Sequence, residues 1–421
     1  MLECPPVQFP HSQEEFTRPY AVAADLLFWG YMGHAVSAPR PIFVCADIGR
    51  GHPFYLDGLR QELGALLPPG VPLESHRAPD LSGPAGRLAW FAIRQMYLRG
   101  SSPGLWSGLY ARLRRNNDYD RDTQALRVLR SALRAGVARA GRGPIVVSHP
   151  LLVAALRPHP CVIYQHGELV TPGEAVVLGA HRVLVPTPEA AAPFLAAGYD
   201  ASTVCITGLC IEPELVAQAE VCFRDRVSRL DSGRSLTGAF FSSGAEPSPH
   251  VETLARALGS AVHSGGTADV FVSRGGRFAA VVTGQRKRMS GEESERVRLH
   301  SFDSRGELDR LTALQFHAFD YVVAPPHERS HWAIGLGLPM FLVGPDVGPF
   351  APLNRRLLLD QGVARPLEDG PGFGASLAQW LAQGQLASMA NLGWGRHSNL
   401  GFAQGARYVV DSLNSWQGDT P

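Results

Sequence analysis

The residues best suited to chemistry lie in the loop Asp47-Ile48-Gly49-Arg50-Gly51-His52. An imidazole titrates near neutral pH, so His52 is predicted to act as a general base that takes a proton from a hydroxyl group. Asp47 would orient His52 or act as a base itself. Gly49 and Gly51 let the backbone approach a bound molecule closely. In the simpler alternative, His52 only packs or binds water and Asp47 only forms a turn.

A strand and a helix must position this loop. Residues 41–46 form a short apolar run typical of a buried parallel strand. From His52 onward the apolar residues recur every three or four positions, which predicts a helix whose free N–H groups face the loop. Phe54 stands where the dinucleotide-binding pattern requires its third glycine, so the loop is not that motif.

The rest of the chain repeats this alternation of strands and helices, which indicates parallel sheets covered on both faces. Strands are predicted at 145–148, 161–165, 182–186, 203–207, 238–242, 269–273, 278–283, 297–302, 320–324 and 340–343. The polar segment 225–234 is predicted to be a linker. We therefore predict an α/β fold with two Rossmann-like domains whose sheets face each other across a cleft. The predicted parts are an arm (1–40), a first domain (41–222), a second domain (235–390) and a helix that returns to the first (391–421).

The composition excludes several classes of protein. The 421 residues are 45% hydrophobic and 18% charged with a net charge of +1, which argues against a disordered chain and against nucleic acid as a partner. Six scattered cysteines show no metal-binding spacing, so no metal site and no disulfide framework are expected. No signal peptide is recognisable, and the apolar segment 21–36 contains Asp25 and His34. We expect a cytoplasmic protein.

Segment 45–52 resembles the first loop of the monogalactosyldiacylglycerol synthases and of their bacterial diacylglycerol glucosyltransferase relatives. Similar segments follow in the same order at 103–110, 185–189, 207–213, 283–288 and 337–339, together with Asn354. The lipid II-forming N-acetylglucosaminyltransferases are more distantly similar. The resemblance implies a glycosyltransferase of the GT-B type, with a nucleotide sugar, most simply a UDP-sugar, as donor. It further implies inverting transfer to a hydroxyl of a lipid or other hydrophobic acceptor, with His52 as base and no cofactor.

The chain departs from the family in the segment expected to bind the donor. The family has a glycine-rich loop before a helix that carries a ribose-binding glutamate, whereas this chain has prolines at 325 and 326 and Trp332 at the glutamate position. Prolines remove N–H groups that would hold a diphosphate. A rebuilt site would use His327, Glu328, Arg329 and His331, since guanidinium and imidazolium groups also bind phosphate. Otherwise the donor site is lost.

Further residues are predicted to contact the donor. Ser243 and Gly244 follow the first strand of the second domain, where a hydroxyl and an amide can bind phosphate oxygens. Arg286 follows the predicted strand 278–283 and would meet the diphosphate, although a solvated loop charge is the alternative. Asn354 matches the nucleotide-sugar region of the family. Trp332 would stack on a base or pack in the core.

The acceptor is predicted to lie against the first domain. His166 and Glu168 follow a strand and would contact the acceptor together with Gly49, Gly51 and Trp106, whereas a plain turn is the alternative for 166–168. Residues 87–142 hold twelve arginines, three acidic residues and many aromatic side chains. This combination is typical of a surface that docks on an anionic membrane, and an ordinary amphipathic helix pair explains it equally well.

Two other functions remain open at this stage. The first is a glycosyltransferase acting on a soluble secondary-metabolite aglycone, with the aromatic segment as its acceptor pocket. The second is a non-catalytic GT-B module that has lost its donor site.

Overall fold

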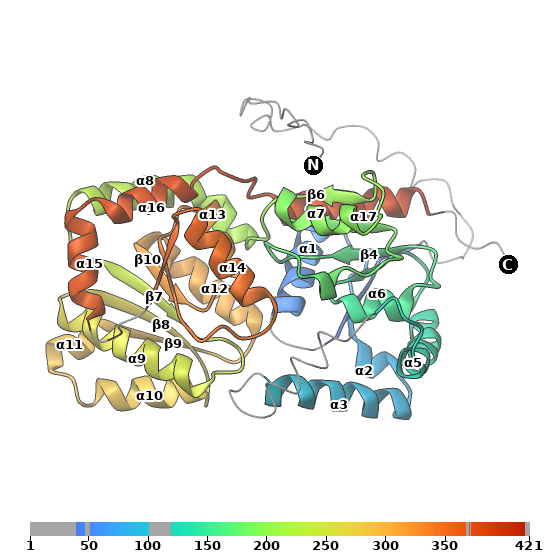
Figure 1. Ribbon diagram of the computed structural model, residues 1–421, viewed down its shortest axis with the longest axis horizontal. Helices are drawn as coiled ribbons and strands as arrows, with labels where there is room; N and C mark the ends of the chain where they lie inside the picture. Colours follow the sequence, from blue (N-terminus) through green and yellow to red (C-terminus); the bar gives the residue numbers. More distant parts are fainter. Residues whose placement is uncertain (1–38, 47–50, 101–118, 368–369, 371, 417–421) are drawn as a thin grey trace, which may run out of the picture. The chain divides into compact units, whose positions relative to one another are not determined.

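The computed structural model describes residues 39–46, 51–100, 119–367, 370 and 372–416. Within them the strands form two parallel sheets of six strands each, in the orders β2-β1-β3-β4-β5-β6 and β12-β11-β10-β7-β8-β9 (Figure 1). The predicted α/β fold class is therefore confirmed. We call the part built on β1–β6 the first half and the part built on β7–β12 the second half.

The strands of the first half are β1 (Ile42–Cys45), β2 (Ser75–Arg77), β3 (Ile145–Val147), β4 (Val162–Gln165), β5 (Arg182–Val185) and β6 (Val204–Ile206). Its helices are α1 (Gly51–Leu66), α2 (Ala78–Leu81), α3 (Pro84–Gly100), α5 (Gln124–Ala140), α6 (Pro150–Leu156) and α7 (Pro188–Ala196). The predictions of a strand at 41–46 and of a helix from His52 onward are confirmed by β1 and α1.

The strands of the second half are β7 (Thr237–Phe241), β8 (Thr267–Ser273), β9 (Val297–Phe302), β10 (Tyr321–Ala324), β11 (Met340–Leu342) and β12 (Ala364–Pro366). The remaining helices are α8 (Pro213–Asp231), α9 (Ser248–His263), α10 (Arg277–Arg286), α11 (Gly291–Glu295), α12 (Arg305–Gln315), α13 (Ser330–Gly335), α14 (Phe350–Asp360), α15 (Phe373–Ala382), α16 (Gln385–Gly393) and α17 (Gly401–Asn414).

Side chains alternate across the second sheet, as the period of a strand requires. Ala239 and Phe241 of β7 lie in the core between the sheet and helices α8, α12 and α13, whereas Phe240 lies in the core under α9 and α15. Helices thus cover both faces, and the carboxyl ends of the parallel strands share one edge. In such sheets, ligands bind at that edge.

Two sequence-based predictions about secondary structure are wrong. The predicted linker 225–234 is largely the end of α8, because Cys222, Arg226 and Leu230 are buried at helical spacing. This pattern is hard to recognise in the sequence because one of the buried residues is an arginine. The guanidinium of Arg226 donates to the carbonyl oxygens of Phe319 and Leu336.

The predicted strand 278–283 is helix α10. Its buried residues, Phe278 and Val282, are four residues apart, which is the spacing of one face of a helix. The run of β-branched and small residues concealed this spacing in the sequence.

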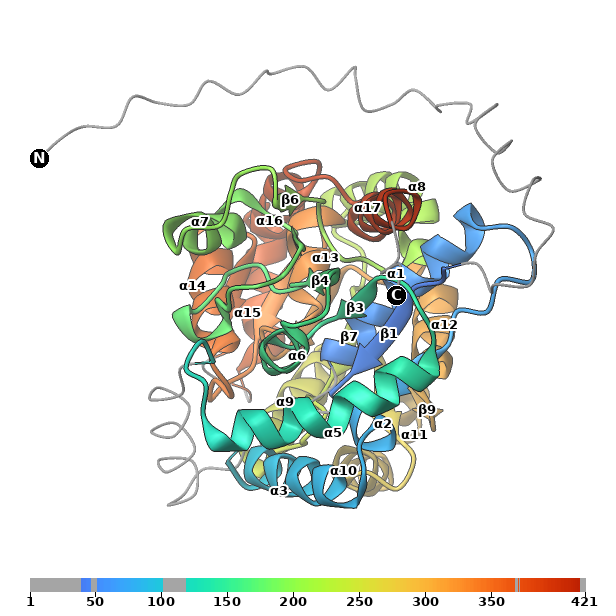
Figure 2. The ribbon, with the colours of Figure 1, turned by 90° about the vertical axis from the view of Figure 1, so that its right-hand side faces the viewer.

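The last helix, α17, packs against α1 of the first half (Figure 2). Phe402, Ala406 and Val409 join the core that also contains Phe43 of β1 and Leu59 of α1. Within the described residues, no helix is long and apolar enough to cross a membrane.

Candidate active site

A carboxylate of the first half meets an amide of the second half at the strand ends. Glu168 follows β4, and its Oε2 accepts a hydrogen bond of 3.1 Å from Nδ2 of Asn354 on α14. The same amide donates to the carbonyl oxygen of Pro326, also at 3.1 Å. Both side chains are buried, with 8% and 0% of each residue exposed. This contact joins the carboxyl edges of the two sheets.

The surroundings of Glu168 favour its protonated form. Burial raises its pKa to about 7, and the hydrogen bond from Asn354 only partly opposes this effect, while the nearby charge of Glu328 adds to it. Tyr55 of α1 also lies close, and burial raises the pKa of its phenol well above the usual value. Glu168 can therefore gain or lose a proton near neutral pH.

His331 of α13 also joins the two halves. Its Nδ1 accepts from the backbone N–H of Cys210 at 3.2 Å, so its Nε2 carries the proton and donates to the carbonyl oxygen of Gly167 at 2.9 Å. Burial lowers the His331 pKa to about 3, so the ring stays neutral. A neutral ring with both nitrogens bonded does not bind a diphosphate, contrary to what a rebuilt donor site would require of it.

His166 lies inside the first half with both ring nitrogens bonded. The hydroxyl of Thr171 donates to the carbonyl oxygen of Ala190, so His166 Nε2 donates to Thr171 Oγ1 at 2.8 Å. The Tyr164 hydroxyl lies 3.2 Å from Nδ1. His166 therefore supports the loop that carries Glu168, and the acceptor contacts of both residues stay predictions.

A network of charged side chains lies beside this contact. Arg305 of α12 pairs with Asp309 at 2.7 Å, with Glu212 at 3.3 Å and with Glu328 at 3.7 Å. Arg329 pairs with Glu328 at 2.8 Å. These two arginines lower the Glu328 pKa to about 2, whereas burial raises that of Asp309 above its usual range. Three carboxyls share two guanidinium groups here.

The predicted donor segment 327–332 is largely committed to this network. Arg329 is 6% exposed, and its guanidinium lies over the ring of Phe241 at 3.9 Å. Trp332 is 1% exposed and donates from Nε1 to Glu212 at 2.9 Å, so it packs in the core. Burial lowers the pKa of His327. The segment thus presents little free positive charge.

Ser243 and Gly244 do lie in the loop that follows β7, and Gly244 is exposed. The Ser243 hydroxyl is buried and makes no hydrogen bond to the described residues. Glu246 of the same loop accepts from the Ser242 hydroxyl and from the N–H of Phe278 at the start of α10. Glu246 therefore occupies a helix N-terminus where an anion would otherwise bind.

The placement of Arg286 contradicts its predicted role. Because 278–283 is helical, Arg286 ends α10 after the chain has returned from the carboxyl edge of the sheet. Its guanidinium donates to the carbonyl oxygen of Ser294, shortly before β9 begins. It therefore lies toward the amino ends of the strands, away from the candidate site.

Five predicted residues cannot be assessed by their side chains. Asp47, Gly49 and Trp106 lie outside the described residues. Gly51 and His52 begin α1, the first helix after β1. Their backbone therefore starts a helix at the carboxyl edge of the first sheet, as the sequence predicts.

A groove of about 900 Å³ opens next to the charged network. It is lined by α1, the start of α8, α12 and α17, and Phe54, Glu212, Arg305 and Asp309 belong to its wall. The Arg305 guanidinium lies 4.1 Å from the centre of the Phe54 ring. The groove thus shares residues with the interface between the two halves.

Sequence reasoning missed Tyr55, Glu212, Arg305 and Asp309. The sequence does signal α12 itself, because Ser304 accepts a hydrogen bond from the N–H of Glu307 and so begins a helix directly after a strand. Nothing in the local pattern indicates that charges on α12 pair with Glu212 or Glu328, which lie far away in the sequence. No group of His, Cys, Asp and Glu residues in the described ranges could hold a metal ion.

No protein-family model and no curated protein matches the sequence. Among solved structures, the chain is similar to UDP-GlcNAc 2-epimerase from Neisseria meningitidis bound to UDP-GlcNAc, with a TM-score of 0.52 and 11% identity over 89% of this chain and 100% of that one. MnaA of S. aureus with UDP gives 0.52 and 11%, over 89% and 96% of the two chains. MurG of Acinetobacter baumannii gives 0.52 and 11%, over 90% and 100%.

These likenesses show the fold. The chain has the GT-B architecture, with two Rossmann-like domains. At this level of identity the comparison assigns no activity, and the resemblance to the monogalactosyldiacylglycerol synthases stays a prediction.

Proposed function

We propose that this protein is a glycosyltransferase that moves a sugar from a UDP-sugar to a hydroxyl of a lipid or other hydrophobic acceptor. The contact between Glu168 and Asn354 carries the proposal, because it brings a protonatable carboxyl to the edge where two Rossmann-like halves meet. Similar structures that hold UDP-GlcNAc and UDP support a UDP-sugar as donor.

In the proposed reaction, His52 takes the proton from the acceptor hydroxyl while its oxygen attacks the anomeric carbon. The bond from that carbon to the diphosphate breaks, and UDP leaves with the electron pair, so the configuration inverts. Glu168 binds the acceptor hydroxyl, since a carboxyl that titrates near neutral pH can accept its hydrogen bond. Ser243 and Gly244 bind phosphate oxygens of the donor.

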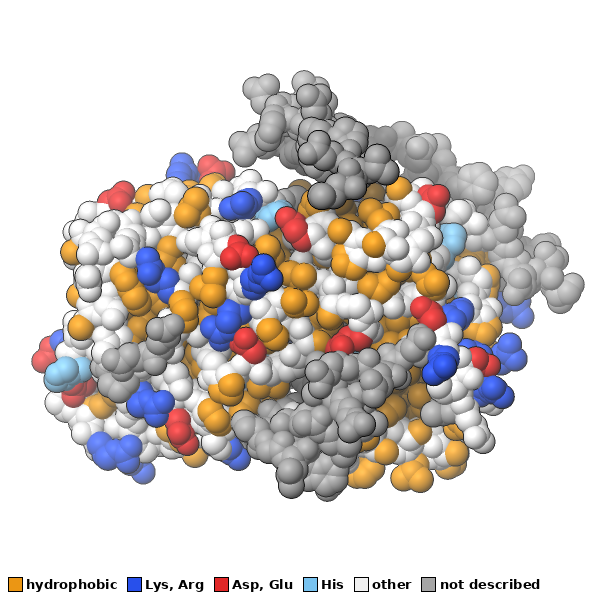
Figure 3. Space-filling view, in the orientation of Figure 1, with side chains coloured by type: hydrophobic (Ala, Val, Ile, Leu, Met, Phe, Trp, Pro, Cys, Tyr) orange, Lys and Arg blue, Asp and Glu red, His pale blue; other side chains and the backbone are white. Residues whose placement is uncertain are grey.

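The exposed side chains of helix α3 support the proposal of a hydrophobic acceptor. Leu88, Phe91 and Met96 are exposed by 70%, 59% and 42%, and apolar side chains gather over this helix in Figure 3. Arg87 and Arg94 of the same helix are exposed as well. Exposed apolar residues beside arginines suit an anionic lipid surface. A soluble aglycone would instead need an enclosed pocket here.

A non-catalytic GT-B module is the second candidate. The observation in its favour is the donor segment, where Glu328 pairs with both Arg329 and Arg305 and prolines replace N–H donors. A segment neutralised by its own carboxylate offers a diphosphate little attraction.

Thermal unfolding with UDP, UDP-glucose, UDP-galactose, UDP-GlcNAc and other nucleoside diphosphates tests the proposal. A ligand present at ten times its Kd stabilises a protein by about 1.4 kcal/mol, which is a measurable shift. We expect a shift with a uridine nucleotide in the wild type and in His52→Ala, and no sugar transfer by His52→Ala.

Three outcomes would decide differently. Absence of any shift across the nucleotides contradicts the transferase and favours the module. Conversion of a bound UDP-sugar without an acceptor assigns an isomerase instead. Flotation with anionic vesicles, lost at high salt, separates a lipid acceptor from a soluble one.

A further inference from the structure

We infer that His331 and Asn354 of the second half are positioning residues. They fix the Gly167–Glu168 segment of the first half, so that the position of the Glu168 carboxyl depends on the contact between the two halves. The acceptor-binding role of that carboxyl rests on the proposed function. The positioning itself concerns the protein without any ligand.

His331 fixes the backbone of this segment. Its ring bridges the carbonyl oxygen of Gly167 and the N–H of Cys210, which precedes α8. Both bonds are buried, and both nitrogens are used, so the ring orientation is set. A Cβ atom on Gly167 would lie 2.1 Å from the Tyr55 ring. The peptide at Gly167 is therefore held by the His331 hydrogen bond and packed closely against the Tyr55 ring.

Asn354 fixes the side chain that follows. Its two amide hydrogens are used by Glu168 Oε2 and by the carbonyl oxygen of Pro326. Both partners are acceptors, so the NH2 end of the amide faces Glu168, while the buried Oδ1 makes no hydrogen bond to the described residues. The amide thus acts as a one-way donor to the carboxylate.

The titratable groups facing Glu168 come from several elements. They include Tyr55 of α1, Tyr164 of β4, Cys210 before α8 and Glu328 after β10. The negative charge of Glu328 disfavours ionisation of Glu168. Conversely, a charged Glu168 disfavours ionisation of the two tyrosines and of Cys210, although the Tyr55 hydroxyl can offer Glu168 a hydrogen bond. Asn354 is consequently the main group of the second half that stabilises the ionised carboxylate, and its removal must favour the protonated form.

The proposal is tested by titrating Glu168 in the ligand-free protein. Carbon-13 NMR of glutamate side-chain carboxyls follows the titration, and Glu168→Gln assigns the signal. We expect Asn354→Ala to raise the Glu168 pKa by about one pH unit or more. Asn391→Ala is the matched control, because Asn391 is an exposed asparagine on α16 whose amide donates only to a helix carbonyl among the described residues.

His331 is tested by a pair of substitutions. His331→Gln keeps one donor and one acceptor and is expected to leave the Glu168 pKa near its wild-type value. His331→Leu lacks both and is expected to shift that pKa and to broaden the signal of the carboxyl. Where His331→Leu does not fold, the smaller His331→Ala, which also lacks both groups, is titrated in its place and is read in the same way.

An unchanged Glu168 pKa in folded Asn354→Ala overturns the assignment of Asn354, and an unchanged pKa in folded His331→Leu overturns that of His331. These titrations contain no nucleotide, so their outcome is independent of the nucleotide experiment. A uridine nucleotide that binds while the pKa stays constant would leave the proposed function standing and this inference refuted.

Discussion

Glu168 and Glu328 are two glutamates that follow strands of different sheets, and their pKa values are shifted in opposite directions. Glu168 is 8% exposed and its pKa is raised to about 7. The Glu328 side chain is 11% exposed and its pKa is lowered to about 2. Burial is thus similar, and the difference lies in the partners. Glu328 pairs with Arg329 and Arg305, whereas Glu168 receives an amide hydrogen bond.

The comparison teaches that partners, more than burial, decide which carboxyl can exchange a proton. The carboxyl edge of the first sheet holds a group that titrates near neutral pH. The corresponding edge of the second sheet holds a permanent charge inside a network. Acid–base chemistry is therefore expected from the first half.

Removing Arg305 should break the comparison with the largest effect. The Arg305 side chain is only 17% exposed, and Arg305→Met removes the cation shared by Glu212, Asp309 and Glu328. We expect the free energy of unfolding to fall by about 3–5 kcal/mol. The Glu328 pKa should rise toward that of Glu168. Urea unfolding measures the first effect, with the exposed Arg310→Met on the same helix as control. A loss no larger than that of the control would contradict a shared network.

Glu168→Gln should sharpen the comparison through its dependence on pH. A pKa raised from 4.5 to about 7 means that the wild type keeps the full contribution of this group below pH 4.5 and loses it as the pH rises through 7. Relative to the wild type, the variant should therefore gain about 3 kcal/mol between these limits. Urea unfolding at a series of pH values measures this. A difference independent of pH would mean that Glu168 ionises normally.

Gly167→Ala should disturb the loop beside Glu168 to a smaller extent. The added methyl group would meet the Tyr55 ring at 2.1 Å, so one of the two must move. Overpacking of this kind costs about 1–3 kcal/mol. Gly173→Ala in the same connection, where nothing lies within 4 Å, is the control for thermal unfolding. Equal stabilities of the two variants would show that the loop adapts freely.

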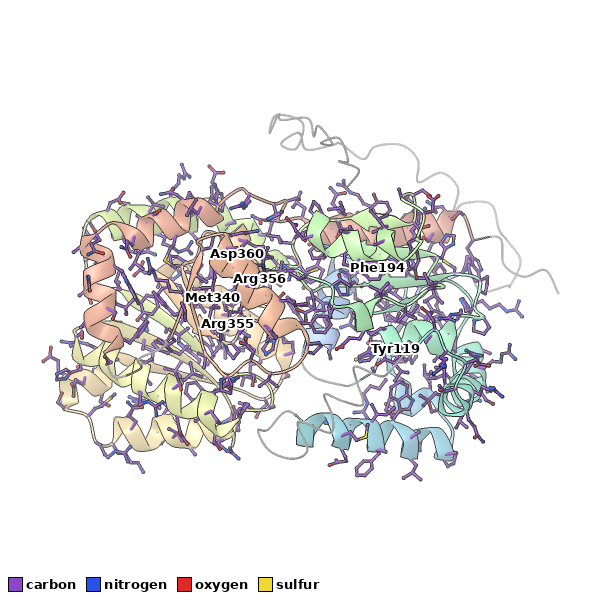
Figure 4. The ribbon with its side chains drawn as sticks, viewed as in Figure 1. Tyr119, Phe194, Met340, Arg355, Arg356 and Asp360 are labelled. Carbon is purple, nitrogen blue, oxygen red and sulfur yellow. The ribbon has the colours of Figure 1, made fainter. Side chains whose placement is uncertain are left out.

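The smallest effect is expected on α14, where neighbouring arginines repeat the contrast (Figure 4). Arg355 is 20% exposed, pairs with both oxygens of Asp346 and donates to the carbonyl of Val343, so Arg355→Ala should cost about 1–2 kcal/mol. Arg356 is 83% exposed and lies 3.6 Å from Asp360, so Arg356→Ala should cost less than about 0.5 kcal/mol. Thermal unfolding of both variants checks the order, and a reversed order would refute it.

The sequence predicted the fold well because strands and helices leave local signals. The apolar run of β1 and the helical spacing of α1 follow directly from residue types and their positions. The errors at α8 and α10 have a common cause, since a buried arginine and a short β-branched run obscured the helical period.

Glu168 was predicted because it follows a strand directly, and Asn354 because it matches the nucleotide-sugar region of the family that the chain resembles. Glu168 and Asn354 were identified separately, but no local pattern reveals that they touch across 186 positions. The same holds for Arg329, whose predicted affinity for phosphate is countered by Glu328, a carboxylate that also pairs with Arg305 of α12. Long-range charge pairing is a property of the folded chain, and a single sequence does not display it.

The packing of α17 on α1 has a consequence for biosynthesis. The ribosome makes α1 early and α17 only after the entire second half, yet Phe402, Ala406 and Val409 complete the core around α1. The nascent first half must therefore wait with an apolar helix face uncovered while translation continues. Such a face attracts chaperones and neighbouring nascent chains, so the speed of translation sets how long the protein is at risk of aggregation.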